Sequence, residues 1–306
     1  MALKKTWNPE GFDTYLSHFP NTPDLKLAAS QNITHQFCDI WNSGLTSLEK
    51  SLDGLNKNIT IVFVRGYLGR YMLNSLKEPA NLLRRLGYDA IIMQQTAGGS
   101  YRDNVQLILQ QLKSRHKRSH FIFCAHSRGG LECLSLLTEN EDIRIKTKAL
   151  IMSQTARGSS HVLESILHGE HQKTNYSWYR SLSEKMQWVM LSAIRAKVGG
   201  EELTSRIWPN LIKRVENQQF NFPVIQTASW STQPTLWLDS FHERLKEIRP
   251  ACAHDGQFFL QDLIWPKINH VLLPNLDHAQ PVVGGLNFNH KHYWLTLINM
   301  IMRNTI

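Results

Sequence analysis

The sequence predicts an α/β fold built on a doubly wound, mostly parallel β-sheet. Short apolar runs rich in β-branched residues recur along the chain, and they alternate with segments whose apolar residues have helical spacing. The run ITIVFV at residues 59–64 is almost entirely apolar, as expected of a strand that is buried on both faces of a parallel sheet. At residues 121–137 an apolar run, a Gly-rich turn and a helical pattern follow one another without a gap, which is the order of a βα unit.

The first element expected along the chain is an amphipathic helix. Residues 1–57 show no strand pattern, and their apolar residues recur at helical spacing: Phe37, Ile40, Trp41, Leu45, Leu48 and Leu52. We expect residues 1–57 to form a helical extension that packs on the main body. Residues 58–306 are expected to form the α/β domain itself.

Strands and helices then alternate along the main body. After residues 59–64, one helix is predicted to end at Gly87, and Ser100 is predicted to cap the start of the next. Further strands are predicted at residues 89–93, 121–124, 149–152, 223–228 and 270–274. The chain closes on a helix whose inward face is predicted to consist of Trp294, Leu297, Ile298 and Ile301. This rhythm is typical of a parallel sheet covered by helices on both faces.

The rhythm stops at residues 157–221, where we predict a helical insertion. A capping box at Ser181 and Glu184 begins a stripe of apolar residues at i, i+4 spacing, made of Leu182, Met186, Met190 and Ile194. Aromatic residues crowd the same segment: Tyr176, Trp178, Tyr179, Trp188 and Trp208. Such an insertion is expected to form a lid over the carboxyl edge of the sheet. The alternative is a helical excursion whose apolar stripe packs on the body.

Composition limits the classes of partner. The 306 residues carry a formal charge of +9 with an isoelectric point near 9.4, a balance that suits an anionic partner. The charge is dispersed, and its one short cluster, at residues 113–118, falls in a predicted loop. We therefore expect no nucleic-acid partner and keep peripheral contact with an anionic membrane as a separate hypothesis. The four cysteines lie far apart without a C-x-x-C pair, so neither a disulfide framework nor a metal site is predicted.

The sequence shows no pattern of a secretory signal or a membrane span. The opening residues MALKKTW lack the apolar segment of a secretory signal peptide, and no later run reaches the ~20 apolar residues of a membrane span. We expect a soluble, cytoplasmic protein. Export by a route without a signal peptide and the oligomeric state stay open.

A serine at the turn after the strand at residues 121–124 is the strongest candidate for a functional side chain. Ser127 lies in the segment AHSRGG, in which small residues, Ala125 and Gly129, stand two positions before and after it. A sharp strand-to-helix turn exposes a serine hydroxyl and crowds the backbone, so these positions must be small; Gly130 lets the helix approach the sheet. The pattern predicts a nucleophile elbow. The alternative is a chance turn between a buried strand and a helix.

A serine nucleophile also needs backbone donors for the oxyanion that forms on attack. The strand at residues 59–64 leads into RGYLG at residues 65–69, a loop of the kind that supplies such a donor. We predict that the N–H groups of Tyr67 and Arg128 form the oxyanion hole. The alternative is a plain strand-to-helix turn. A phosphate-binding loop is less favoured still, because the loop lacks the glycine patterns that bind phosphate.

Fourteen histidines compete for the role of the base. In folds with a nucleophile elbow the chain order is Ser, acid, His, which favours histidines late in the chain. We predict His278, because it follows the last predicted strand directly, at the edge of the sheet where the elbow emerges. The alternatives are His254 and His270, which lie within or just before elements, and His290 and His292, for which a solvated helix start is the simpler explanation.

For the acid we predict Asp255, which begins an Asp-Gly turn after the penultimate strand and its helix. A buried carboxylate at this point would orient the imidazole and stabilise its charged form. The alternatives are Asp239 in a helical pattern, Asp262 beyond the turn, and Asp277, whose neighbour His278 is too close in sequence to meet it favourably. An ordinary Asp-Gly turn is the other interpretation.

These segments together resemble the α/β-hydrolase superfamily, and within it the bacterial lipase- and esterase-like serine hydrolases. The resemblance rests on residues 125–130, Arg65-Gly66, His254-Asp255-Gly256 and Leu276-Asp277-His278-Ala279, and it spans about residue 60 to the C-terminus except the insertion. It implies that Ser127, Asp255 and His278 act as nucleophile, acid and base, with the amides of Tyr67 and Arg128 as the oxyanion hole.

The resulting expectation is a hydrolase of carboxylic esters that needs neither a metal nor an organic cofactor. The apolar insertion favours an acyl or lipid-like substrate, because it would line an acyl pocket. Two alternatives use the same residues, a thioesterase and an acyltransferase. A third, from another class, is a binding module with a hydrolase fold and no catalytic activity.

Overall fold

A six-stranded parallel sheet organises the part of the chain that the structure describes. The computed structural model describes residues 7–10, 16–72, 75–114, 120–168, 197–216, 218–231, 239–285 and 287–305. The strands are β1 (Ile59–Val64), β2 (Asp89–Ile92), β3 (His120–His126), β4 (Thr147–Ser153), β5 (Val224–Trp230) and β6 (Asn269–Pro274). Every predicted strand is found within two residues of its expected ends, so the prediction of a doubly wound parallel sheet is confirmed.

The strand order shows that the direction of winding reverses between β1 and β3. The order is β2-β1-β3-β4-β5-β6, so the chain leaves β1 for a neighbour on one side and then crosses to β3 on the other. Where the direction of winding reverses in this way, the loops after the two central strands separate and leave a crevice at their carboxyl ends. The segments that follow β1 and β3 are therefore the expected place for a functional site.

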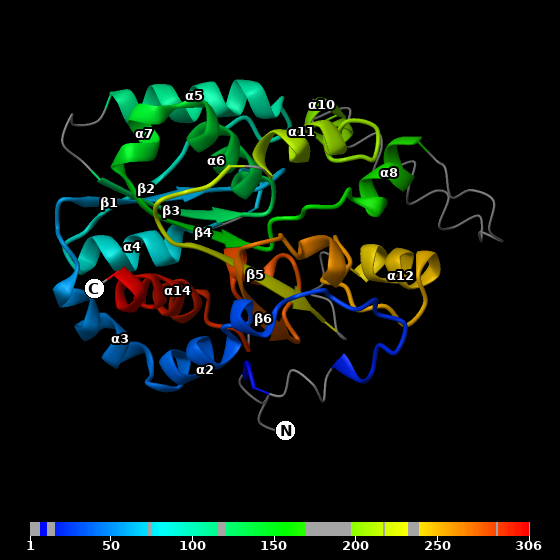
Figure 1. Cartoon of the computed structure of the whole chain (residues 1–306), viewed down its shortest axis with the longest axis horizontal. Coiled ribbons are helices and arrows are strands. Elements are labelled where there is room, and N and C mark those ends of the chain that lie inside the picture. The colour runs from blue at the N-terminus through cyan, green and yellow to red at the C-terminus, as the bar shows by residue number, and fades with distance from the viewer. Residues whose placement is uncertain are drawn as a thin grey trace.

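Helices cover both faces of the sheet (Figure 1). On one face lie α5 (Tyr101–Lys113), α6 (Arg128–Glu139), α7 (Glu141–Lys146) and α11 (Trp208–Val215), and on the other α4 (Lys77–Arg85) and α14 (His290–Thr305). The side chains of β1 divide accordingly: Val62 and Val64 belong to the apolar core on the α5 and α6 side, whereas Ile61 and Phe63 belong to the core on the α14 side. The predicted inward face of the last helix is buried as expected.

Shorter elements complete the described chain. The helices are α8 (His161–His168), α10 (Lys197–Glu201), α12 (Asp239–Ile248) and α13 (Gln280–Val283), with 3-10 turns η1 (Ala29–Gln31), η2 (Leu52–Gly54) and η3 (Leu260–Leu263). Ser100 caps α5 as predicted, since its side chain accepts from the backbone N–H groups of Arg102 and Asp103 at 3.1 and 3.3 Å.

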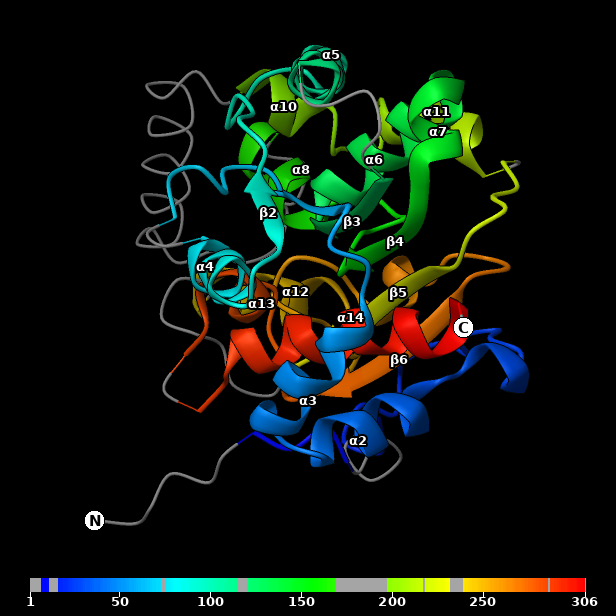
Figure 2. The same ribbon diagram turned by 90° about the vertical axis from the view of Figure 1, so that its left-hand side faces the viewer.

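The N-terminal region contains two helices where the spacing of apolar residues predicted one. They are α2 (Thr34–Asn42) and α3 (Leu45–Ser51), and Gly44 between them has a φ of 82°. That left-handed backbone turns the chain between the helices, and glycine adopts it without the steric cost that a Cβ adds. The expectation of one continuous helix is therefore wrong, although both pieces pack on α14, and Figure 2 shows them beneath α14 and β6.

The same region also covers the open edge of the sheet. The N–H of Ile33 donates to the carbonyl of His270 at 2.9 Å, and the N–H of Leu272 donates to the hydroxyl of Thr34 at 2.9 Å. An uncovered edge strand would offer unpaired backbone groups to other chains. The N-terminal segment thus satisfies backbone groups of β6 that the sheet leaves free.

The described parts of the insertion are helical and include α8, α10 and α11. Trp208 is buried at the start of α11, where its indole N–H donates to the carbonyl of Arg157 at 2.5 Å. The predicted stripe at residues 182–194 and the other four aromatic residues lie outside the described residues. The lid therefore stays a prediction.

None of the described helices has the length and the apolar character required to cross a bilayer. The four cysteines all lie within the described ranges and are unpaired. Cys38 is half-buried and Cys124, Cys133 and Cys252 are buried.

One buried histidine of β6 should make the stability of the fold depend on pH. His270 is fully buried, accepts from the N–H of Trp265 at 3.0 Å and contacts the carbonyl of Ile268 at 2.8 Å; burial lowers its pKa to about 4. Between pH 6.5 and about 4 the unfolded chain binds a proton here that the native state does not. As the pH is lowered through this range, this group should therefore reduce the free energy of unfolding by about 1.4 kcal/mol per pH unit.

The substitution His270→Gln should remove that contribution. Chemical denaturation between pH 7 and 4.5 should give the variant a shallower loss of unfolding free energy than the wild type. The exposed His35 provides the control, because His35→Gln should leave the slope unchanged. Equal slopes for His270→Gln and the wild type would contradict the assignment.

Candidate active site

Ser127 occupies a sharp turn between β3 and α6. It has a φ of 54°, a left-handed conformation that is uncommon for a residue with a side chain. Its N–H donates to the carbonyl of Ser153 at the end of β4, at 2.8 Å. Backbone conformations of this kind persist only where the surroundings impose them, and they concentrate at functional sites.

Glycines let the turn pack against the loop after β1. A Cβ on Gly129 would lie 2.5 Å from the carbonyl oxygen of Arg65 and 2.7 Å from that of Val64. A Cβ on Gly66 would lie 2.7 Å from the Cβ of Ser127. All three distances are shorter than a Cβ atom tolerates, so the close approach of the two segments requires glycine at both positions.

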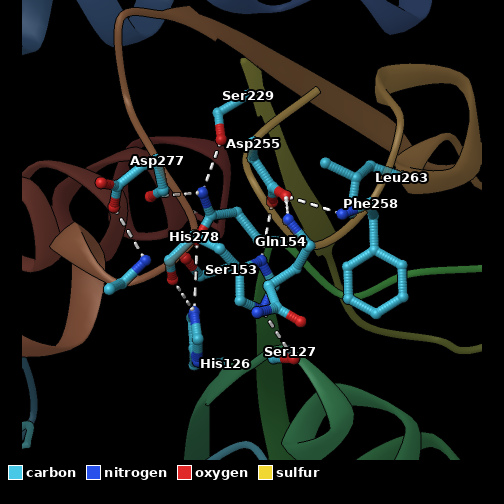
Figure 3. A network of polar contacts seen from close by, with 12 residues as sticks. His126, Ser127, Ser153, Gln154, Ser229, Asp255, Phe258, Leu263, Asp277 and His278 are labelled. Carbon is cyan, nitrogen blue, oxygen red and sulfur yellow. Dashed lines mark hydrogen bonds and ion pairs between the residues drawn. The ribbon is translucent and has the colours of Figure 1, made fainter. Parts of the chain in front are cut away.

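The structure brings Ser127, His278 and Asp255 into one hydrogen-bonded chain (Figure 3). The Oγ of Ser127 lies 2.9 Å from the Nε2 of His278, and the Nδ1 of His278 lies 2.7 Å from the Oδ2 of Asp255. His278 stands in the loop directly after β6, as predicted, and its backbone N–H donates to the carbonyl of Asp255 at 2.8 Å. All three residues are buried.

Asp255 is held at the tip of a small hairpin. A bridge between His254 and Phe259 closes the hairpin, and the Oδ1 of Asp255 accepts from the N–H groups of Gln257 and Phe258, both at 2.9 Å. Burial opposes ionisation of this carboxyl, but the charge and hydrogen bond of His278 and the two amides outweigh it. The pKa of Asp255 is therefore lower than usual, and the group is a carboxylate near neutral pH.

Two of the other candidate acids, Asp277 and Asp262, have different partners. The Oδ1 of Asp277 accepts from the N–H groups of Ala279 and Gln280 at 2.9 and 3.0 Å, so its side chain starts α13. Asp262 lies in η3 with its Oδ2 4.0 Å from the Nε2 of His161, and burial raises its pKa to about 6. Asp239 is the first residue of α12.

The other candidate histidines also lie elsewhere. His254 is buried with its ring 4.8 Å from that of His242, and His292 stacks on Trp41 at 3.8 Å. The expectation that the start of the last helix is solvated is wrong for His290, which is buried and lies 3.3 Å from the carboxylate of Glu78. The loop between α13 and α14 covers it: a Cβ on Gly284 would lie 3.4 Å from its ring.

The two predicted oxyanion donors, the N–H groups of Tyr67 and Arg128, belong to two segments near Ser127. Arg128 is the first residue of α6, and an N–H in the first turn of a helix has no partner four residues earlier. Tyr67 follows Gly66, where an added Cβ would lie 2.7 Å from the Cβ of Ser127. The loop after β1 therefore passes close to Ser127.

A buried polar network fixes the loop that contains Tyr67. The side chain of Gln95 pairs with both backbone groups of Arg65, accepting from its N–H at 2.9 Å and donating to its carbonyl at 3.0 Å. Gln95 also donates to Glu132, which accepts from the Nε of Arg128 at 3.1 Å. Sequence reasoning missed Gln95 and Glu132, although the i, i+4 spacing of Arg128 and Glu132 on a predicted helix is a signal for that pair.

Burial acts on this network as well. It raises the pKa of Glu132 above the usual range, against the opposing effect of Arg128, Asn104 and Gln95. The Nη2 of Arg128 donates to the carbonyl of Gly99 at 2.5 Å. A buried guanidinium and carboxyl that share several hydrogen bonds tie α6 to the loops after β1 and β2.

Comparison with known proteins gives similarity of structure only. No protein-family model matches the chain, and no curated protein matches its sequence. The chain is similar to the solved structure of a metagenomic carboxyl esterase, MGS0156, with a TM-score of 0.64 and 16% identity over 81% of this chain and 77% of that one. It is also similar to the mature lipase BlEst2 of Bacillus licheniformis, with a TM-score of 0.54 and 15% identity over 78% and 92%. At these identities the similarity shows the fold.

The substitution Gly129→Ala tests the close approach at the turn. The added Cβ must displace the backbone of residues 64 and 65 or the start of α6, so we expect a loss of about 1–3 kcal/mol in unfolding free energy. Gly54→Ala is the matched control, since nothing lies within 4 Å of a Cβ at that position. Equal stability of the two variants in urea would contradict the packing described here.

Proposed function

From the α/β-hydrolase fold of this chain, we propose that it is a serine hydrolase that cleaves carboxylic esters. The observation that carries the proposal is the hydrogen-bonded chain from Ser127 through His278 to Asp255, at 2.9 and 2.7 Å. A strained serine, an imidazole and a buried carboxylate in this order form the arrangement that activates a hydroxyl for acyl transfer.

The proton arrangement follows from the surroundings of Asp255. Because its carboxylate accepts two backbone N–H groups on one oxygen, the other oxygen accepts the Nδ1–H of His278. The Nε2 of the imidazole then has a free lone pair and accepts the hydroxyl proton of Ser127. Asp255 fixes this tautomer and stabilises the imidazolium that forms when the proton moves.

In the first half of the proposed reaction, the Oγ of Ser127 attacks the ester carbonyl and its proton passes to His278. The negative charge of the tetrahedral intermediate develops beside the N–H groups of Tyr67 and Arg128, which we propose as the oxyanion hole. When the intermediate collapses, His278 protonates the leaving alcohol and an acyl-enzyme remains. Water, deprotonated by the same imidazole, then releases the acid and restores Ser127.

The similar structures support an ester substrate, and the proposed lid supports an acyl or lipid-like one. The two similar structures are named a carboxyl esterase and a lipase. The insertion at residues 157–221 is proposed as a lid, and the position of α10 supports this, since a Cβ on Gly200 would lie 2.9 Å from the hydroxyl of Tyr67. An apolar lid favours an acyl or lipid-like substrate. A thioesterase or acyltransferase would use the same residues and differ only in leaving group or acceptor.

The substitution Ser127→Ala tests the nucleophile. We expect hydrolysis of chromogenic esters of graded chain length to fall by at least about 10³-fold, because triad members act as a unit. A fluorophosphonate probe should label the wild type at Ser127, as located by peptide mass spectrometry, and should not label the variant. Ser135→Ala, at a buried serine on α6, is the control and should keep full activity.

Other outcomes of these measurements identify the alternatives. Transfer of the acyl group to glycerol or lysophospholipid in preference to water would identify an acyltransferase, and faster cleavage of thioesters a thioesterase. Absence of labelling and of hydrolysis in the wild type would contradict the proposal and favour a binding module with a hydrolase fold.

We also propose peripheral contact with anionic membranes, motivated by the charge of +9. The protein should sediment with vesicles that contain anionic lipid, and the bound fraction should fall as salt rises, because salt screens exposed charges. Vesicles of neutral lipid are the control. No sedimentation with anionic vesicles at low salt would contradict the hypothesis.

A further inference from the structure

Two buried side chains connect the strand of Ser127 to the loop of His278 (Figure 3). The Nε2 of His126, the residue before Ser127, lies 2.8 Å from the carbonyl oxygen of His278. The Nε2 of Gln154, the residue after β4, donates to the carbonyl of Asp277 at 2.9 Å. The two contacts fall on consecutive peptide groups of the loop that presents the imidazole.

Hydrogen bonds fix the position and the proton of each of these side chains. The Oε1 of Gln154 lies 3.2 Å from the Nε2 of His126, and the Nε2 of Gln154 also donates to the hydroxyl of Ser229 at 2.5 Å. Since both partners of the His126 Nε2 are carbonyl oxygens, this nitrogen must bear the proton. Burial lowers the pKa of His126 to about 3, so the ring is neutral and adds no positive charge beside the imidazole of His278.

The backbone of Gln154 is held as firmly as its side chain. Gln154 has a φ of 51°, and its N–H donates to the carbonyl of Thr227 at 3.0 Å. The carbonyl of the preceding Ser153 accepts the N–H of Ser127 at 2.8 Å. His126 and Gln154 therefore stand next to the two residues that join the nucleophile turn to β4.

We propose that His126 and Gln154 are positioning residues that set the place of the His278 ring relative to Ser127. The inference rests on the proposed function of Ser127 and His278. The base comes from β6, three strands away from β3 in the sheet, so the sheet alone does not bring its loop to the nucleophile. The backbone of His278 is anchored at both ends, its N–H to the carbonyl of Asp255 and its carbonyl to His126.

The expected consequence is a loss of rate without a loss of binding. Displacing a reacting group by a fraction of an ångström lowers the population of reactive geometries, and about 1 Å can cost about 100-fold. Gln154→Met and His126→Phe remove the donors and keep most of the volume. Each should lower kcat for ester hydrolysis about 10- to 100-fold with KM within about two-fold of the wild type. The rate of fluorophosphonate labelling of Ser127 should fall in the same proportion.

The chain offers a matched control for a merely structural effect. Gln226 is a fully buried glutamine on β5 that donates to two carbonyls, those of Thr155 and Leu263, at 2.9 and 3.1 Å. Gln226→Met removes two hydrogen bonds donated by the side-chain amide, as Gln154→Met does, and should lower the denaturation midpoint in the same way. Its kcat should equal that of the wild type.

A milder substitution covers the case in which Gln154→Met does not fold. Gln154→Asn keeps the amide but shortens the side chain by one methylene, so it should fold and should still lower kcat. Wild-type kcat in folded Gln154→Met or Gln154→Asn, or an equal loss in Gln226→Met, overturns the positioning role alone. A wild type that neither hydrolyses esters nor reacts with the probe overturns the proposed function together with it.

Discussion

The close approach of two backbone segments at Gly66 and Gly129 is the constraint on which the site depends. Because β1 and β3 are neighbouring parallel strands, the loops that follow them start side by side at the same edge of the sheet. The missing Cβ atoms let the turn at Ser127 approach the loop after β1 closely. A side chain at either glycine would push the two segments apart and so change the position of Ser127.

Around this contact the structure uses few charges and many neutral hydrogen bonds. The carboxylate of Asp255 is fully buried, yet its two amide donors and His278 compensate the cost of removing it from water. On the other side of Ser127, the side chain of Arg128 binds Glu132, and Gln95 connects that carboxyl to the loop that contains Tyr67. One buried network thus joins the two segments that contain the proposed oxyanion donors, and it resists independent movement of these segments.

Periodicity and turn chemistry were sufficient to predict the sheet and the turn at Ser127, because those signals are local. The break at Gly44 was missed because apolar spacing continues across it, and only the positive φ reveals the two helices. The roles of Gln95 and Gln154 could not be predicted, because their hydrogen-bond partners are far away in sequence. The backbone group that Gln95 binds is 30 residues away, and the one that Gln154 binds is 123 residues away. A glutamine that binds distant carbonyls looks, in sequence, like any other polar residue near a strand end.

Sequence motifs predict the reacting side chains more readily than the positioning residues His126 and Gln154, and the hydrogen bonds of these two residues explain why. The donors His126 and Gln154 bind carbonyl oxygens of residues 277 and 278, which any amino acid would supply. The reacting atoms need particular side chains, whereas an acceptor on the backbone places no demand on residue type. The residue type therefore matters only for the donor of each hydrogen bond. The two donors lie next to Ser127 and next to the end of β4, where the sheet already fixes the backbone.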